Sequence, residues 1–289
     1  MLFSQVQAFL MVLDTGSFTE AAFRLNVAQS SVSHSLSRLE KHLGVRLLQR
    51  DRSGVRLTPQ GEALLPYFRS IAHGVTQLEL AARQQQGEVS GKVKIGSFPS
   101  TSCRILPRAI SLLKQQHPQV EVLIFEGTAS EVERWLENHT VDLAFVELPT
   151  RSHFQLTAVF QDQLRLIVPH GHPLDVEGEI QLSQIAPFPY VLSKFGCEPL
   201  IRQAFSQQGL TLDVVYEVRD ITTLMALVEE NIGVSLVPEL LVPHSTAALA
   251  SLPVRPVIQR EVALARHPEV VQTPQSRALA EQIFRVKPG

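Results

Sequence analysis

The stretch SFTEAAFRLNVAQSSVSHSLSRLEKHLGVRLLQRDRSGVRLT, residues 17–58, decides the fold of the N-terminal part of this 289-residue chain. Ser17 and Glu20 have the spacing of a capping box, which satisfies free backbone N–H groups and starts a helix. After a short turn, a second helix is predicted over residues 29–43, ended by Gly44, a residue type that favours helix C-termini. Four apolar residues of this second helix recur at a spacing that gives one buried stripe: Val32, Leu36, Leu39 and Leu43.

The face opposite that stripe is polar and poor in acidic residues. It carries Ser30, His34, Ser37, Arg38 and Lys41, with Ser33 on its flank. Small hydroxyls permit close approach to a surface and longer polar groups reach base edges, so the helix suits the major groove of duplex DNA. The residues that we predict to contact DNA from the two helices are Thr19, Gln29, Ser30, Ser31, Ser33, His34, Ser37 and Arg38.

A small β-wing is predicted to follow the second helix. Residues 45–50 alternate as a strand, residues 51–54 have turn chemistry, and residues 55–57 return. Basic residues outnumber acidic ones between positions 38 and 56, and we predict phosphate contacts from Arg50, Arg52 and Arg56. The alternative is that this charge is solvated surface, which is the usual role of charge runs.

This stretch resembles the N-terminal signature of LysR-type transcriptional regulators, without a gap over about sixty positions. The resemblance implies a regulator, either an activator or a repressor, that binds promoter DNA as an oligomer and responds to a small-molecule effector. The sequence departs from the family at Leu48, where Phe is usual, although both are apolar. The matching elements are Phe9, residues 16–19, Ala21, Ala22, Leu25, Gln29, Ser30, Ser33, Leu39, Glu40, Leu43, Gly44, Leu47, Arg50, residues 57–59 and Gly61.

Charge is divided unevenly along the chain. Residues 1–88 hold nine Lys and Arg against seven Asp and Glu, whereas the remainder holds 17 against 21. A mildly basic head on an acidic body is expected when only the head meets phosphate. No apolar run is long enough for a transmembrane helix, the N-terminus lacks the basic region of a signal peptide, and two cysteines are too few for a disulfide framework. We therefore expect a cytoplasmic protein without a membrane partner.

A long helix is predicted from Pro59 to about residue 86, with Thr58 as its N-cap. Heptad spacing of apolar residues along this helix favours pairing with the same helix of a second copy. The alternative is that the seam packs on its own domain. We expect a homodimer, and the resemblance implies a dimer of dimers, a homotetramer. The residues assigned to dimerisation are Leu64, Phe68, Ile71, Val75 and Leu78.

The periodicity changes after a hinge at residues 84–91. Strand-like runs, for example at 164–168, alternate with helical segments such as 105–116, which is the pattern of a parallel sheet covered by helices. The resemblance implies an N-terminal all-α winged helix-turn-helix with a long linker helix, then an α/β effector-binding domain of two subdomains, similar to type 2 periplasmic binding proteins. The expected domains are residues 1–58 for DNA binding, 59–88 for the linker helix and hinge, and 89–289 for the effector. Subdomain I comprises residues 89–162 and 263–289, and subdomain II comprises residues 163–262.

Ligands of open α/β sheets bind beyond the carboxyl ends of the strands, against helix N-termini. Hydroxyls and free N–H groups there suit a small organic anion, and the alternative is that each hydroxyl only caps its helix. Lys194, Arg104, Arg202 and Arg219 are nearby cations in the sequence, without an assignment to the cleft. The residues that we expect at the cleft are Ser100, Thr101, Ser102, Thr128, Glu147, Phe195, Gly196, Cys197 and Thr222.

Cys197 has a second candidate role. It lies near the position where peroxide-sensing relatives keep a reactive cysteine, and a helix N-terminus lowers the pKa of a thiol, although no resolving cysteine follows closely. A redox-responsive regulator acting through Cys197 is therefore one alternative, and a ligand-binding protein whose head contacts proteins is another.

Enzyme classes find little support. The sequence has no HExxH, CxxC, GxSxG or P-loop motif, so we expect neither an enzyme nor a bound metal or cofactor beyond the effector. RNA polymerase is a further candidate partner.

Overall fold

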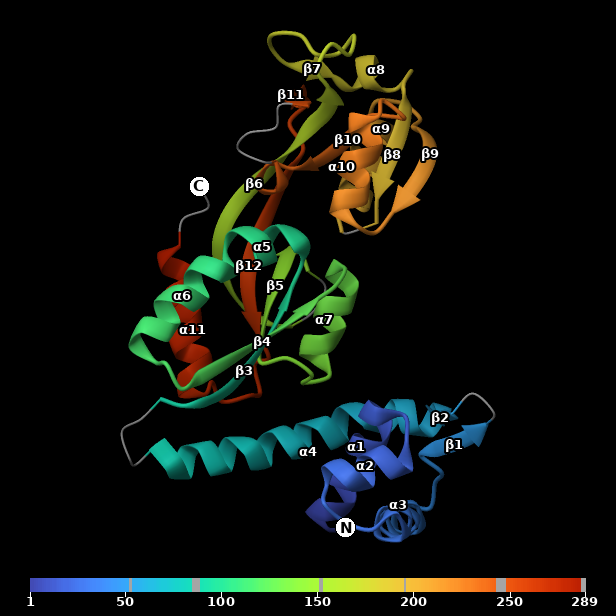
Figure 1. The fold of residues 1–289 in the computed structure, drawn as a ribbon, viewed down its shortest axis with the longest axis vertical. Helices are drawn as coiled ribbons and strands as arrows, with labels where there is room; N and C mark the ends of the chain where they lie inside the picture. Colours follow the sequence, from blue (N-terminus) through green and yellow to red (C-terminus); the bar gives the residue numbers. More distant parts are fainter. Residues whose placement is uncertain (52–53, 85–88, 151–152, 195, 243–247, 287–289) are drawn as a thin grey trace. The chain divides into compact units, whose positions relative to one another are not determined.

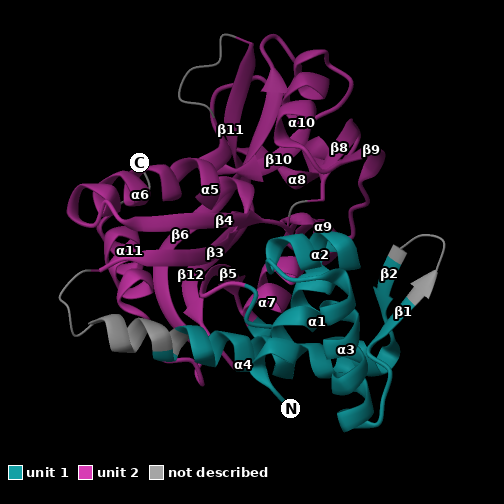
Figure 2. Ribbon diagram, turned by 60° about the horizontal axis from the view of Figure 1, so that its bottom comes forward, with its two compact units in different colours: residues 1–88, 137–140 teal, residues 89–136, 141–289 magenta. Residues whose placement is uncertain are grey.

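The computed structural model describes residues 1–51, 54–84, 89–150, 153–194, 196–242 and 248–286. The chain divides into two compact units, residues 1–88 with 137–140 and residues 89–136 with 141–289, which Figure 2 colours separately. No helix among the described residues is long and apolar enough to cross a membrane.

The first unit contains three short helices, a two-stranded wing and one long helix (Figure 1). Ser17 caps the second helix by accepting the N–H of Glu20 at 3.3 Å, as predicted, whereas the Glu20 carboxylate pairs with Arg24 at 2.8 Å. Gly44 ends the third helix with a φ of 72°. The elements are α1 (Phe3–Thr15), α2 (Phe18–Arg24), α3 (Gln29–Leu43), β1 (Leu48–Asp51), β2 (Gly54–Leu57) and α4 (Pro59–Gln84).

The wing begins later than the sequence pattern suggests. The carboxylate of Glu40 on α3 accepts the N–H groups of Leu47 and Leu48 at 2.7 and 3.2 Å. These bonds hold residues 45–47 against α3, so the antiparallel pairing of β1 with β2 starts only at Leu48, opposite Leu57.

Thr58 joins the wing to α4. Its hydroxyl donates to the carbonyl of Arg46 at 2.6 Å and accepts the N–H of Gly61 at 2.9 Å. A Cβ atom added to Gly61 would lie 2.1 Å from the carbonyl oxygen of Leu47. Only glycine permits that approach of two backbones, and the first turn of α4 is therefore fixed against the wing.

Phe68 on α4 belongs to the apolar core of the first unit. Its side chain is 4% exposed and its ring centroid lies 4.7 Å from that of Phe9 on α1, while Leu64 packs on the same cluster. Our assignment of Phe68 to a seam between two copies is therefore wrong, because a buried ring is not available to a partner. Ile71 and Leu78, further along α4, are 37% and 71% exposed.

The second unit is an α/β domain with an eight-stranded sheet in the order β4-β3-β5-β12-β6-β11-β7, in which β10 also pairs with β6. β8 and β9 form a separate parallel pair. Its elements are β3 (Gly91–Ser97), α5 (Pro99–Arg104), α6 (Leu106–Gln116), β4 (Val120–Glu126), α7 (Ala129–Glu137), β5 (Leu143–Leu148), β6 (Gln155–Pro169), β7 (Ile180–Gln181), α8 (Leu182–Ile185), β8 (Pro189–Ser193), α9 (Glu198–Gln207), β9 (Asp213–Val218), α10 (Ile221–Glu229), β10 (Ser235–Pro238), the 3-10 helix η1 (Glu239–Leu241), β11 (Leu249–Arg255), β12 (Gln259–Arg266) and α11 (Pro274–Arg285).

Two antiparallel strands, β6 and β12, connect the two halves of this unit. At one end β12 lies beside β5, and at the other end β6 pairs with β10 and β11. In Figure 1 they run from the half that holds β3, β4 and α11 to the half that holds β8, β9 and α10. These halves are subdomains I and II.

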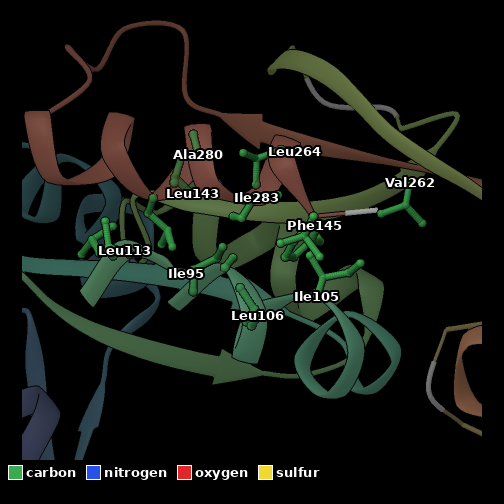
Figure 3. Close-up of a cluster of buried hydrophobic side chains, with 14 of the residues drawn as sticks. Ile95, Ile105, Leu106, Leu113, Leu143, Phe145, Val262, Leu264, Ala280 and Ile283 are labelled. Carbon is green, nitrogen blue, oxygen red and sulfur yellow. The ribbon is translucent and has the colours of Figure 1, made fainter. Parts of the chain in front are cut away.

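Each subdomain has its own apolar core. In subdomain I, side chains of β3, β5 and β12 meet those of α6 and α11, as Figure 3 shows for Ile95, Phe145, Leu264, Leu106 and Ile283. In subdomain II a second cluster is built around the β8 and β10 strands and helix α9. The two cores leave a boundary between the subdomains, and polar side chains gather there.

Candidate DNA-contacting helix and ligand cleft

Helix α3 has the amphipathic character that its periodicity predicted. Val32, Leu36 and Leu39 are 1%, 5% and 0% exposed and pack with α1 and α2. Glu40 is turned to the wing backbone, so the acidic residue of α3 is withdrawn from the opposite face. The predicted contact residues that lie exposed on α3 are Gln29, Ser30, Ser31, His34, Ser37 and Arg38, whereas Ser33 is half-buried.

The remaining predicted DNA contacts lie on α2 and the wing. Thr19 is exposed in the first turn of α2, and Arg56 is exposed on β2. The side chain of Arg50 and the whole of Arg52 lie outside the described residues. Apart from half-buried Ser33, the described residues predicted to contact DNA are therefore exposed polar side chains on α3, α2 and β2.

A narrow cavity lies between the subdomains. Its volume is about 20 Å³, room for about one water molecule. Subdomain I contributes Ser100 at the start of α5, and subdomain II contributes Cys197 at the N-terminus of α9. The full lining comprises Phe98, Pro99, Ser100, Ser193, Cys197, Ile221, Leu236, Val237, Pro238, Leu241 and Arg260.

Arg260 on β12 lines this cleft and donates hydrogen bonds to three other residues around it. Its side chain is only 2% exposed, and its Nε and Nη2 donate to Asp162 Oδ2 at 3.1 and 2.6 Å. Nη2 also donates to Ser100 Oγ at 2.8 Å, and Nη1 donates to Glu147 Oε1 at 3.1 Å. Burial by itself lowers the pKa of Arg260, but the neighbouring acidic groups, including Cys197, outweigh burial and raise it. A guanidinium surrounded in this way stays charged.

The helix and the cleft lie in two parts of the chain that each match a known protein family model. Residues 3–62 match a family model described as a bacterial regulatory helix-turn-helix protein of the lysR family, and residues 86–287 match one described as the LysR substrate binding domain. The chain belongs to the LysR family of transcriptional regulators. It is a DNA-binding regulator with an effector-binding domain.

The matches of this LysR-type regulator to individual relatives and solved structures cover between 83% and 99% of the chain. The HTH-type transcriptional regulator YvbU of Bacillus subtilis is 31% identical over 241 residues, which cover 83% of this chain and 82% of that protein. Among solved structures, a full-length OxyR variant from Pseudomonas aeruginosa has a TM-score of 0.79 at 22% identity, covering 98% and 94% of the two chains. Full-length CbnR complexed with its target DNA has a TM-score of 0.69 at 22% identity, covering 99% of each chain. The two structures show a shared fold.

Several hydroxyls that we expected in the cleft of this LysR-type regulator are used within the protein. Thr101 is fully buried, and its hydroxyl lies 2.7 Å from Ser97 Oγ and donates to the Phe98 carbonyl at 2.9 Å. Thr128 forms a capping pair with Glu131, whose carboxylate accepts the Thr128 N–H and hydroxyl at 2.9 and 2.8 Å. For these two residues the capping interpretation describes the structure better than ligand contact does.

The other expected residues divide between the cleft and its surroundings. Ser100 and Cys197 line the cavity, and Glu147 reaches it through Arg260. Gly196 lies beside Glu147, because a Cβ atom on it would be 3.7 Å from Oε1. Thr222 is exposed in the first turn of α10, and Phe195 lies outside the described residues. Ser102 does not line the cavity, and its Oγ is buried without a hydrogen-bond partner among the described residues.

Three of the four cations named from the sequence serve other contacts. Arg104 donates to the carbonyls of Leu240 and Val242 at 2.8 and 2.7 Å. Lys194 and Arg202 share ion pairs with Glu198 and Glu217. Sequence reasoning missed Arg260 and Asp162, because each stands between polar residues in the sequence and nothing there marks it as buried.

Cys197 is protected rather than reactive. It is 2% exposed, and burial raises the pKa of its thiol to about 12, although Arg260 acts to lower it. A thiol that is protonated and enclosed is a poor nucleophile. The redox-responsive alternative is therefore not favoured.

Proposed function

We propose that this LysR-type regulator reads promoter DNA by laying the exposed face of α3 in the major groove, with Arg56 and the wing on phosphates. The supporting observation is the separation of α3 into a buried apolar stripe and an exposed polar face. Residues 1–58 would form the DNA-binding head, 59–88 the linker, and 89–289 the effector domain. In this proposal the protein acts in the cytoplasm and has no enzymatic activity.

Two substitutions on α3 test base reading. Arg38→Ala and His34→Ala should each reduce affinity for a native promoter fragment by about 1–3 kcal/mol. The His34 variant should also change base preference, which is measured by fluorescence anisotropy against a panel of single-base operator variants. Arg108→Ala, an exposed change on α6, is the matched control and should bind as the wild type does. Unchanged affinity and preference in both α3 variants would rule out this groove assignment.

The oligomer that we propose is a homodimer formed through the exposed part of α4, which assembles further to a homotetramer. Phe68 and Leu64 pack in the core of the head. Further along α4, Ile71 and Leu78 are exposed and Val75 is half-buried. Exposed apolar side chains at heptad spacing are covered efficiently by a second helix. RNA polymerase would be contacted by the assembled regulator on DNA.

The effector in this proposal is a small organic anion that exchanges with Glu147 on Arg260. Asp162 is held by two bonds and its side chain is 3% exposed, whereas Glu147 is held by one bond at 3.1 Å and is 15% exposed. Glu147 is therefore the carboxylate that is easier to replace. Ser100 Oγ accepts from Arg260, so its own O–H is free to donate to the incoming anion.

Effector binding would widen the cleft. A cavity of about 20 Å³ holds no organic acid, so binding favours a conformation in which the subdomains stand further apart. A ligand that prefers one of two conformations shifts their populations by its difference in affinity. That shift is the signal passed to the DNA-binding heads.

A thermal-shift screen of organic acids on the full-length protein tests the effector site. An acid that stabilises the wild type should lose most of its effect on Ser100→Ala and keep it on Ser130→Ala, an exposed serine of α7. Glu147→Gln removes the competing charge and should strengthen binding. Weaker binding to Glu147→Gln would mean that Glu147 recognises the ligand rather than competing with it.

A further inference from the structure

A second, larger pocket lies wholly within subdomain I. Its volume is about 520 Å³, within the range of about 300–1,000 Å³ that small-molecule sites occupy. It forms where the first residues of β6, the last residues of β12 and helix α11 come together. None of its lining residues lines the cleft that holds Arg260.

The floor of this pocket is part of the core. Leu143, Leu264 and Ala280 are 1%, 5% and 6% exposed, and Figure 3 shows them among the packed side chains of β5, β12 and α11. Two large apolar side chains at the edge, Leu156 and Phe284, are 40% and 44% exposed. An apolar molecule resting on this floor would remove both side chains from water, which is favourable.

The charged residues of the pocket are mainly cationic. Arg266 at the end of β12 and Arg277 on α11 face a single acidic lining residue, Glu281. Among the residues that the structure describes, neither guanidinium lies within ion-pair distance of a carboxylate. Two guanidinium groups beside an apolar floor favour a ligand whose negative charge is carried at one end.

We propose that this pocket is a second small-molecule site of the effector domain and that it takes an amphipathic organic anion, an aliphatic or aromatic carboxylate. The apolar body lies on Leu143, Leu264 and Ala280, and the carboxylate lies between Arg266 and Arg277. A cationic ligand would be repelled, and a neutral one would leave both guanidinium groups without a counter-charge.

The site is also connected to the cleft by the same two strands. Thr157 and Leu264, which line the pocket, are register partners on β6 and β12, and Asp162 and Arg260 are register partners further along these strands. A ligand in the pocket therefore contacts the strand pair that carries the ion cluster of the cleft. If this ligand changes the affinity for the effector by some factor, the effector must change the affinity for this ligand by the same factor.

Hexanoate is a suitable probe, with hexanol as the neutral comparison. Titration of the full-length protein labelled at leucine methyl groups separates the two sites, because Leu143, Leu156 and Leu264 report on the pocket and Leu236 and Leu241 on the cleft. Hexanoate should shift the pocket methyl groups, and hexanol should bind about tenfold more weakly, since it lacks the charge-assisted hydrogen bonds.

Variants complete the test. Thr157→Trp fills the pocket from an exposed strand position and should abolish the shifts, whereas Ser130→Trp, at an exposed position of α7 outside the pocket lining, should not. The double change Arg266→Gln with Arg277→Gln should weaken hexanoate binding about tenfold or more, and Arg285→Gln, also on α11, should not. The proposal is overturned if millimolar hexanoate shifts only the cleft methyl groups or none, or if the Thr157→Trp variant binds hexanoate as the wild type does. It is also overturned if Thr157→Trp alters the oligomeric mass, because this surface would then be an interface between copies. Failure of the cleft variants alone would count against the effector proposal and leave this site standing.

Discussion

Replacing Arg260 by methionine should destabilise the effector domain strongly. The substitution keeps a long apolar stem but removes the guanidinium that binds Asp162 at 2.6 and 3.1 Å and Ser100 at 2.8 Å. Asp162 is buried and would lose its cationic partner, although its Oδ1 would still accept the N–H of Gln163 at 2.9 Å. Breaking a buried ion pair by removing one member costs about 3–5 kcal/mol, because the remaining charge is poorly solvated.

Urea denaturation measures this cost directly. The chain has one tryptophan, Trp135 on α7, whose ring packs edge-on against Phe125 at 6.0 Å. Its fluorescence therefore reports unfolding of subdomain I. We expect the free energy of unfolding of Arg260→Met to fall by about 3–5 kcal/mol, with an unchanged denaturant slope.

Two comparison variants separate the buried charge from a loss of packing. Asp162→Asn added to Arg260→Met should recover about 2 kcal/mol, because the orphaned charge is gone and neighbouring substitutions are not additive. Arg165→Met, on the same strand as Asp162, removes a partly exposed ion pair with Glu239 at 3.7 Å and two hydrogen bonds to Ser251 at 3.0 and 3.3 Å. It should cost about 1–2 kcal/mol, because it leaves no buried charge behind. If Arg260→Met costs no more than Arg165→Met, or if the double variant is no more stable than the single one, the reasoning about Arg260 is refuted.

Three further outcomes follow from the head and from the cysteines. At pH 8, iodoacetamide should modify exposed Cys103 but not Cys197 in the native protein, as read by peptide mass spectrometry. The reason is that Cys197 is buried and burial raises the pKa of its thiol to about 12, so the reactive thiolate is scarce. Equal labelling of the two cysteines would revive the redox alternative. Phe68→Ala should lower the stability of the head by about 3–5 kcal/mol in calorimetry, whereas Leu78→Asp should leave it nearly unchanged and reduce the mass found by light scattering. Ser17→Ala should cost the head about 1 kcal/mol through loss of the α2 cap, and a cost near zero would show that Ser17 does not cap α2 in solution.

Local patterns predicted the DNA-binding head well. The stripe of Val32, Leu36 and Leu39, the cap at Ser17 and the stop at Gly44 each depend on residues within one or two helical turns. The helix predicted at 105–116 is confirmed as α6 for the same reason. Phe68 was misassigned, because heptad spacing does not reveal whether the partner is a second copy or Phe9 of the same chain.

The residues of the cleft could not be predicted from local sequence patterns, because they come together only through the pairing of distant strands. Arg260 and Asp162 are 98 residues apart in the sequence and meet only after β6 and β12 pair in the observed register. The first residues of β6 were missed, since Gln155, Leu156, Thr157 and Ala158 are all exposed and show no alternation of burial. Thr101 and Thr128 were overvalued, because a hydroxyl at a helix N-terminus has the same sequence signature whether it caps the helix or binds a ligand.

The close backbone contact between Gly61 and Leu47 fixes the start of α4 against the wing. No side chain separates the helix from the wing there, and Phe68 clamps the next turns onto Phe9. If α4 rotates, we therefore expect α3 and the wing to rotate with it as one rigid body. We therefore expect the effector to leave the affinity of one head for a single half-site nearly unchanged. We expect it to alter the distance and angle between the two half-sites that a pair of heads accepts, which makes operator spacing the variable to test.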